Sequence, residues 1–398
     1  MLLFYFFAIL QIFLGFKSLR GGMNYLNYFK RELAKPKSDY TPFASIIVPC
    51  RGIDEDLREN LEELFLQNYA DYEIVFAVDD ERDSALDVIE EVSLGGTVNA
   101  EIVIAGLALE SGQKVHNLRK AVLEVSERCE VLVFVDSDAR PDRDWLRNLI
   151  SPLEDESVGC ATGYRWFLQK SGGFATHLRS VWNASIASSL GANSENNFCW
   201  GGSTAIRRSV FDELKVREKW KGTLSDDFAL TSILKQAEMP IHFAPQCLTA
   251  TVEDCSFREL LEFTTRQIKI TRVYSPTHFK VSLIGSILFT AIFWTGVCLL
   301  FLTSGIHFWI TFSSVSLIFL LGVAKAWLRF KSVRLVLAKY DKQLWRQIIP
   351  QLTFWAVTPI LYLYNNMLAL HSREIVWRRI RYKLESPNKT VIIERNDE

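Results

Sequence analysis

The sequence predicts an α/β protein, with a mostly parallel sheet flanked by helices, an N-terminal membrane anchor and C-terminal transmembrane helices. Short apolar runs alternate with runs of helical period from about residue 43 to residue 252. The first sixteen residues are apolar apart from Gln11, and the last third of the chain holds further long apolar runs. We expect an anchor at residues 1–20, a cytoplasmic α/β domain at 40–275, membrane segments at 280–371 and a basic cytoplasmic tail at 372–398.

Composition argues against several classes of protein. The 398 residues include 45 basic and 46 acidic side chains, a net charge of −1, so nothing suggests a nucleic-acid partner. Seven scattered cysteines without a C-x-x-C pair fit neither a disulfide framework nor a zinc site, and indicate reduced thiols. A glycine-rich G-x-G-x-x-G or Walker loop is absent from the sequence, which argues against dehydrogenases and nucleotide hydrolases.

The N-terminal apolar run has its positive charges behind it rather than in front of it. The basic residues that follow are Lys17, Arg20, Lys30, Arg31, Lys35 and Lys37. A secretory signal carries its charge first, so we expect an uncleaved anchor, with the basic side and the following domain in the cytoplasm. Sixteen residues are short against the roughly 20 needed to cross a bilayer, so a shallow insertion is the alternative.

Strands and helices alternate in the α/β domain. The expected strands are Ala44–Val48, Glu73–Val78, Glu101–Ala105 and Val131–Val135. The expected helices between them are Asp54–Asn68, Ser84–Val92 and Lys114–Glu127. Such alternation predicts parallel strands joined by right-handed crossovers.

Two carboxylates, Asp136 and Asp138, directly follow the apolar strand Val131–Val135. Open α/β sheets bind ligands just beyond the carboxyl ends of such strands. Oxygen ligands two residues apart suit a divalent metal ion that also carries phosphate oxygens. The alternative is an ordinary solvated loop. We favour a metal-bound phosphate site.

Three other polar features lie near strand or helix ends. Asp79, Asp80 and Asp83 close the second strand, and the loop Asn197–Arg207 carries Trp200, Gly201 and Gly202. Asp226 and Asp227 open a helix expected at Phe228–Glu238, where a plain helix cap is the alternative interpretation.

A capping box at Ser256–Glu259 predicts a helix that runs to about Val273. One face of this helix carries Arg266, Lys269 and Arg272. These cations suit either a surface that faces lipid headgroups or a site for a pyrophosphate leaving group.

The apolar runs in the last third of the chain predict membrane segments. Val281–Thr303 and Ile306–Trp327 are long enough to span and are joined so closely that we expect a hairpin. Ile348–Leu370 is also apolar but contains two prolines and two asparagines, Pro350, Pro359, Asn365 and Asn366. A basic tail follows it, so we expect a re-entrant or interfacial segment.

The ordered motifs resemble an inverting, family-two glycosyltransferase of the GT-A fold, and more closely the ceramide glucosyltransferases and their bacterial relatives. The resemblance rests on the acidic motif within Val75–Asp83, D-S-D at Asp136–Asp138, D-D-F at Asp226–Phe228, and W-R-x-x-R-Y at Trp377–Tyr382. It covers about residues 43–272 and the tail. The implied fold is a GT-A-type sheet inside a multi-pass integral membrane protein.

The resemblance implies roles for the donor site. Asp80 would contact the uracil and ribose of the nucleotide, and Lys114 would lie in the donor pocket. Asp136 and Asp138 would form the metal-binding D-x-D. Trp200, Gly201 and Gly202 would belong to the loop around the donor sugar and the acceptor.

The resemblance also implies that Asp227 is the catalytic base. The family's R-x-x-R-W motif falls on Arg266–Ile270, where this chain keeps cations at Arg266 and Lys269 but has isoleucine in place of tryptophan. The missing indole argues against a processive polysaccharide synthase. Arg266 and Lys269 would then add positive charge at the departing diphosphate.

The function implied is transfer of a single sugar, glucose from UDP-glucose by resemblance, to the hydroxyl of a membrane lipid such as ceramide. Diacylglycerol, a hopanoid or a polyprenyl phosphate are alternative acceptors. The expected cofactor is Mg²⁺ or Mn²⁺, with a UDP-sugar as donor substrate. A polysaccharide synthase, a nucleotidyltransferase and a non-catalytic membrane scaffold are the alternative classes.

Overall fold

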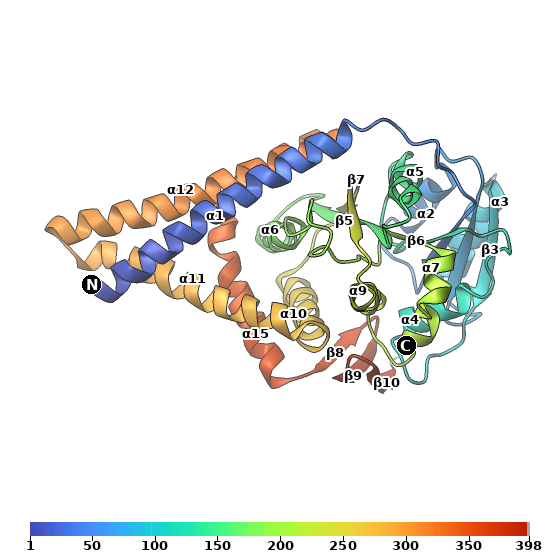
Figure 1. Ribbon diagram of the computed structural model, residues 1–398. Coiled ribbons are helices and arrows are strands. Elements are labelled where there is room, and N and C mark those ends of the chain that lie inside the picture. Colours follow the sequence, from blue (N-terminus) through green and yellow to red (C-terminus); the bar gives the residue numbers. More distant parts are fainter. Residues whose placement is uncertain (97, 396–398) are drawn as a thin grey trace. The chain divides into compact units, whose positions relative to one another are not determined.

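The computed structural model describes residues 1–96 and 98–395 (Figure 1). The chain divides into two compact units. The helical unit comprises residues 1–31, 168–188 and 252–372, and the sheet unit comprises residues 32–167, 189–251 and the chain from Arg373 onward. The candidate site residues that follow strands all lie in the sheet unit.

The sheet unit is built on a seven-stranded sheet in the order β3-β2-β1-β4-β6-β5-β7. The strands are β1 (Ala44–Pro49), β2 (Tyr72–Val78), β3 (Asn99–Ile104), β4 (Val131–Phe134), β5 (Cys160–Leu168), β6 (Thr204–Arg207) and β7 (Ile241–Val252). Strands β3, β2, β1 and β4 are parallel to one another, whereas β6 is antiparallel to both β4 and β5. The predicted mostly parallel sheet flanked by helices is confirmed.

Helices connect these strands close to where the sequence predicts them. They are α2 (Leu57–Phe65), α3 (Ala85–Gly95), α4 (Gln113–Ala121), α5 (Trp145–Ile150), α7 (Arg208–Glu213), α8 (Val216–Lys219) and α9 (Asp226–Gln236), with a 3₁₀ turn at Ser151–Glu154. Helix α4 ends six residues earlier than expected. The chain turns after Ala121, and Val122 and Val125 enter the core instead of continuing the helix.

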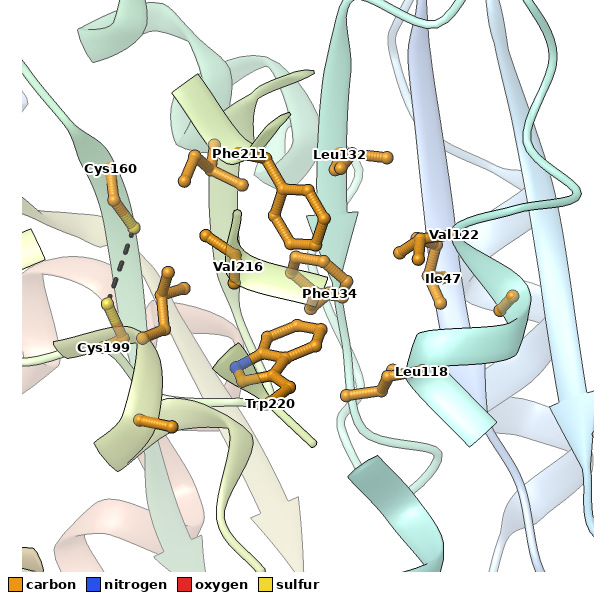
Figure 2. Packing of buried hydrophobic residues seen from close by; sticks show 14 of the residues in the cluster. Ile47, Leu118, Val122, Leu132, Phe134, Cys160, Cys199, Phe211, Val216 and Trp220 are labelled. Carbon is orange, nitrogen blue, oxygen red and sulfur yellow. Dashed lines mark hydrogen bonds between the residues drawn. The ribbon is translucent and has the colours of Figure 1, made fainter. Parts of the chain in front are cut away.

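The core beside β4 packs aromatic rings against aliphatic side chains (Figure 2). Trp220 lies edge-on to Phe134 and to Phe211, with ring centroids 5.4 and 5.5 Å apart. Cys160 Sγ and Cys199 Sγ are 3.6 Å apart, and all seven cysteines are free thiols. This packing fixes β4, which carries the D-S-D loop at its end.

The helical unit contains three helices that are long and apolar enough to cross a membrane. They are α1 (Leu2–Leu33), α11 (Pro276–Leu302) and α12 (Gly305–Val336). Helix α1 is therefore twice as long as its apolar run of sixteen residues suggests. Gly15 of α1 lies against α12, because an added Cβ would be 2.9 Å from Leu321 Cδ1, and small residues allow such close packing of membrane helices.

The predicted hairpin of α11 and α12 is present, and these two helices pack together. Gly305 has φ of 58° at the start of α12, a left-handed conformation that favours glycine. The other helices of this unit are α6 (Phe174–Ala187), α10 (Phe257–Tyr274), α13 (Asp341–Arg346), α14 (Ile348–Thr353) and α15 (Thr358–His371), with 3₁₀ turns at Ala338–Tyr340 and Phe354–Ala356. The capping box of α10 has both of its reciprocal hydrogen bonds.

The segment between residues 348 and 370 is broken into α14, a 3₁₀ turn and α15, and none of these helices is long enough to be a candidate span. Its asparagines are fully buried. Asn365 Oδ1 accepts a hydrogen bond from Thr265 Oγ1 of α10 (3.0 Å), and Asn366 Nδ2 donates to Ser282 Oγ of α11 (3.1 Å). The polar residues of this segment therefore bind neighbouring helices.

The basic tail is folded. It forms an antiparallel three-stranded sheet of β8 (Glu374–Trp377), β9 (Ile380–Ser386) and β10 (Lys389–Arg395). Ile380, Tyr382 and Leu384 are buried and alternate with exposed residues, which is the period-two pattern of a half-buried strand. This C-terminal sheet belongs to the sheet unit.

Close packing inside the large sheet leads to a stability prediction. A Cβ added at Gly163 of β5 would lie 2.2 Å from the Cys247 carbonyl oxygen and 2.5 Å from Ser203 Oγ. We expect Gly163→Ala to lower the free energy of unfolding by about 1–3 kcal/mol, because backbone must move to admit the methyl group. Thermal unfolding followed by tryptophan fluorescence measures this.

Gly191→Ala is the matched control, because nothing lies within 4 Å of a Cβ added there. Equal melting temperatures for the two variants would contradict the prediction.

Candidate active site

The D-S-D loop after β4 is held by two largely buried cations. Lys114 Nζ, from the first turn of α4, lies 2.6 Å from Asp136 Oδ1. Arg165 on β5 donates to Asp136 Oδ2 at 3.3 Å and to Asp138 Oδ2 at 3.2 Å. One guanidinium thus bridges both carboxylates, and the structure brings together three of the predicted site residues with Arg165, which was not predicted.

Lys114 also pairs with Asp226 Oδ1 at 3.1 Å, in the first turn of α9. Gly201 lies directly against this pair, since an added Cβ would be 2.5 Å from Asp226 Oδ2 and 2.6 Å from Lys114 Nζ. Any larger residue at position 201 would separate the charges. The first of the paired glycines, Gly201, is therefore required because a side chain there would collide with the ion pair.

Trp200 covers the same group of charges. Its ring lies under the guanidinium of Arg165, 4.9 Å from ring centroid to Cζ, in a cation–π contact. An added Cβ at Gly202 would be 2.2 Å from this indole, so the second glycine lets the ring fold back over the loop. Trp200, Gly201, Lys114, Asp136 and Asp138 thus form one cluster, and their role as a donor site stays a prediction.

Burial and the neighbouring opposite charges shift the pKa values of the cluster's side chains in opposite directions. Burial favours neutral Asp136, but Lys114 and Arg165 outweigh it and hold the pKa of Asp136 below its ordinary value. Burial, only partly offset by Lys114, raises the pKa of Asp226 to about 6, and the neighbouring Asp227 and Asp136 contribute. Burial lowers the pKa of Lys114, but Asp136 and Asp226 overcome this and raise it. The lysine therefore stays charged at neutral pH.

Asp227, the predicted base, is half-buried beside Asp226. Its Oδ1 accepts hydrogen bonds from Phe228 N (2.7 Å) and from Ser225 Oγ. Among the residues that the structure describes, no basic side chain forms a salt bridge with it. Neutral hydrogen-bond donors thus hold the carboxylate of Asp227 in place, whereas the carboxylate of its neighbour Asp226 is paired with Lys114.

The predicted nucleoside contact, Asp80, is exposed at the end of β2, where its Oδ1 accepts from Arg82 N at 2.8 Å. Its neighbour Asp79 is buried, pairs with Arg51 (2.9 Å) and accepts from Asn117 Nδ2 (2.7 Å). The first aspartate of this motif is therefore a structural anchor, and the second is the one available to a ligand.

Arg266 and Lys269, predicted to assist the leaving group, lie on α10 in the helical unit. Arg266 stacks over Phe263 at 5.7 Å. Arg272, on the next turn, donates to the carbonyls of Ala369 and Leu370 near the end of α15, which stabilises that helix terminus. The roles of Arg266 and Lys269 stay predictions.

A second contact to the D-S-D loop comes from the C-terminal sheet. Ser137 Oγ donates to Asp54 Oδ2 at 3.1 Å, and Arg378 forms a two-pronged pair with the same carboxylate. Neither Asp54 nor Arg378 was predicted as a site residue. Arg378 lies in the W-R-x-x-R-Y motif, so its sequence signal was present.

The residues fit a divalent cation. Asp138 Oδ1 is buried and has no hydrogen-bond partner within the described part of the chain. Mg²⁺ is commonly held by one or two carboxylates together with substrate phosphates. No group of three or more His, Cys, Asp or Glu side chains that could hold a metal occurs among the described residues.

The raised pKa of Asp226 generates a prediction for stability. An acid whose pKa is raised by folding stabilises the folded state below its unfolded pKa, ~4, and loses that contribution as the pH rises through about 6. We expect the free energy of unfolding of the wild type to fall by about 1–3 kcal/mol relative to Asp226→Asn across this window. Melting temperatures of both proteins between about pH 4.5 and 7.5 test it. Parallel pH dependence of the two proteins would contradict it.

Comparisons with known proteins identify the family of this chain. The sequence model of Glycosyl transferase family 21 matches residues 5–390. Ceramide glucosyltransferase 1 of Caenorhabditis elegans is 27% identical over 214 residues, which cover 52% of this chain and 45% of the relative. Glycosyltransferase AglE of Haloferax volcanii is 26% identical over 136 residues, 34% of this chain and 43% of that protein. The matches span less than half the length of these relatives.

Solved structures of glycosyltransferases are also similar. Mannosyltransferase PcManGT from Pyrobaculum calidifontis, in complex with GDP-Man and Mn²⁺, is 17% identical with a TM-score of 0.48, covering 92% of this chain and 98% of that chain. Glucosyl-3-phosphoglycerate synthase from Mycobacterium tuberculosis, in complex with Mn²⁺, UDP-glucose and glycerol 3-phosphate, is 15% identical with a TM-score of 0.38, covering 58% and 79%. The family match over most of the chain confirms the resemblance inferred from the motifs: the chain belongs to Glycosyl transferase family 21.

Proposed function

We propose that this protein is a membrane-bound glycosyltransferase that moves a single sugar from a nucleotide-sugar donor to the hydroxyl of a lipid, with inversion. UDP-glucose is the first candidate donor, and ceramide is the first candidate acceptor. The observation that carries the proposal is the D-S-D loop, held by Lys114 and Arg165 at the end of β4, with Asp227 close by on α9. The name of the C. elegans relative supports glucose as the sugar and ceramide as the acceptor.

The cluster suits a diphosphate. Lys114 and Arg165 provide two largely buried positive charges, and phosphate oxygens would compete with the carboxylates for them. Asp138, with Asp136, would hold a divalent cation, which acts as a Lewis acid and neutralises charge on the leaving diphosphate. Arg266 and Lys269 are proposed to add positive charge.

Asp227 would take the proton from the acceptor hydroxyl. Two neutral donors, the Phe228 amide and the Ser225 hydroxyl, orient its carboxylate. A direct displacement needs only one base on the acceptor side, because no covalent intermediate forms. Asp226 is less suited to this role, since its charge is already shared with Lys114.

Other site residues would position the donor. Asp80 is exposed and is proposed to contact the nucleoside. The loop from Trp200 to Gly202 is proposed to lie around the sugar, because Gly201 already lies against the charged pair. These roles combine the family resemblance with the cluster described above.

The division of the chain supports a membrane topology. The C-terminal sheet and the large sheet belong to one compact unit, so we propose that both lie on the same side of the membrane. The hairpin of the candidate spans α11 and α12 would cross twice and return to that side. The segment 348–371 would then make no net crossing, as a re-entrant or interfacial segment does. Basic residues after α1 and at the end of α12 favour the cytoplasm as this side.

The first test uses membranes that contain the full chain, radiolabelled UDP-glucose and a mixture of lipid acceptors. We expect label in the lipid extract, and we expect Asp227→Asn to lower the rate by about 10²–10⁴-fold, because a general base contributes that much. Asp212→Asn is the control, since Asp212 is an exposed partner of Arg208 on α7.

The alternatives give different results. Label in a non-extractable polymer would indicate a polysaccharide synthase. No transfer from any of several nucleotide sugars, or full activity in Asp227→Asn, would reject the proposed reaction.

Metal dependence is a separate prediction. EDTA should abolish transfer, and added Mn²⁺ or Mg²⁺ should restore it. Asp138→Asn should raise the metal concentration needed for half-maximal activity by at least about 10-fold, because it removes a proposed ligand oxygen. Titration of Mn²⁺ against the initial rate measures this. An unchanged midpoint would exclude Asp138 as a ligand.

A further inference from the structure

The turn between β8 and β9 has an unusual conformation. Trp377 pairs with Ile380, and the two residues between them, Arg378 and Arg379, have φ of 51° and 62°. A two-residue hairpin turn with positive φ at both positions normally carries Asn-Gly or Gly-Gly. This left-handed backbone conformation costs free energy in residues other than glycine, and such strained residues cluster at functional sites.

Arg378 reaches the D-S-D loop through Asp54. Its Nη1 and Nη2 lie 2.5 and 2.6 Å from Asp54 Oδ1 and Oδ2. Ser137, between the two aspartates of the motif, donates to the same Asp54 Oδ2. The strained turn therefore places a guanidinium beside the loop proposed to hold the metal.

The charges of the loop act on Arg378 as well. Burial alone would lower its pKa, but Asp54, and behind it Asp138 and Asp136, raise the pKa above the ordinary value. The side chain is nevertheless 40% exposed, and its hydrogen bonds to Asp54 and to the Arg51 carbonyl use Nη1 and Nη2. Arg378 thus keeps donors for a ligand while its orientation is fixed by a carboxylate.

Attachment of the C-terminal sheet does not rest on Arg378 alone. Tyr382 Oη accepts a hydrogen bond from Gln113 N, in the first turn of α4, at 3.2 Å. Arg395 donates to Gln113 Oε1 at 2.9 Å and to the Ala108 carbonyl. These contacts also hold the sheet through β9 and β10, so the arginine turn is not its sole anchor.

We propose that Arg378 binds the diphosphate of the nucleotide-sugar donor, so that the C-terminal sheet completes the donor site. This inference rests on the proposed function. A guanidinium oriented by one carboxylate can offer its remaining N–H groups to phosphate oxygens, and its planar fork suits two-pronged contacts that lysine cannot reproduce.

The experiment measures binding rather than turnover. The full chain in detergent or nanodiscs, with Mn²⁺, is titrated with UDP and with uridine by calorimetry or by displacement of a fluorescent UDP analogue. We expect Arg378→Ala to weaken UDP binding by at least about tenfold, with less than about a twofold change for uridine, because only the diphosphate contact is lost. Arg378→Lys should bind UDP with an affinity between those of the wild type and Arg378→Ala.

Arg381→Ala is the matched control. Arg381 lies on the same hairpin and pairs with Glu374 at 2.6 Å, so its loss should leave UDP affinity within about twofold of the wild type. Melting temperatures of the variants without ligand show whether the C-terminal sheet is intact.

The outcomes separate this inference from the function on which it rests. If the wild type binds UDP and Arg378→Ala binds it equally well, the role of Arg378 is overturned while the proposed function stands. If Arg378→Ala and Arg378→Lys weaken uridine as much as UDP, or melt well below Arg381→Ala, Arg378 is only structural. If the wild type binds no UDP, the proposed donor itself is rejected.

Discussion

The site depends on Lys114, whose ammonium joins Asp136 and Asp226. A buried lysine is tolerated only when it is paired, and here the pairing connects the end of β4, the start of α4 and the start of α9. Gly201 has no room for a side chain because it lies against these charges. Without the lysine, two largely buried carboxylates would face each other. The position of Asp227 follows from the same contact, since it is the next residue on α9.

The parts of this arrangement that depend on local pattern could be predicted from the sequence. A buried strand reads as an apolar run, and polar residues placed directly after it must lie at the sheet edge, which is how Asp136 and Asp138 were found. The membrane helices are likewise signalled by apolar length. The segment 348–370 is broken into short helices, and its predicted re-entrant or interfacial placement stays a prediction. The length of α1 was missed because its second half carries charges, which a helix tolerates once it leaves the bilayer.

Contacts between distant residues could not be predicted in this way. Arg165 is the one charged residue of β5, and nothing in the local sequence says which carboxylates it will meet. Asp54 and Arg378 are 324 residues apart. The C-terminal sheet was different, because Ile380, Tyr382 and Leu384 show the alternation of a strand. The sequence analysis predicted only a basic cytoplasmic tail there, because the basic composition was given more weight than the alternation.

Arg378 lies near the end of the chain, and this position bears on when its contact with Asp54 can form during synthesis. Asp54 is made before α11 and α12, and Arg378 after them, so their pair can close only after both helices have been synthesised. Closing so long a loop has an entropic cost that rises slowly with length, and the hydrogen bonds of Tyr382 and Arg395 to the α4 region offset it. The large sheet and its D-S-D loop can form earlier from local crossovers. On our proposal, a chain that has not been synthesised as far as Arg378 would have the D-S-D loop but lack the arginine that completes its diphosphate site.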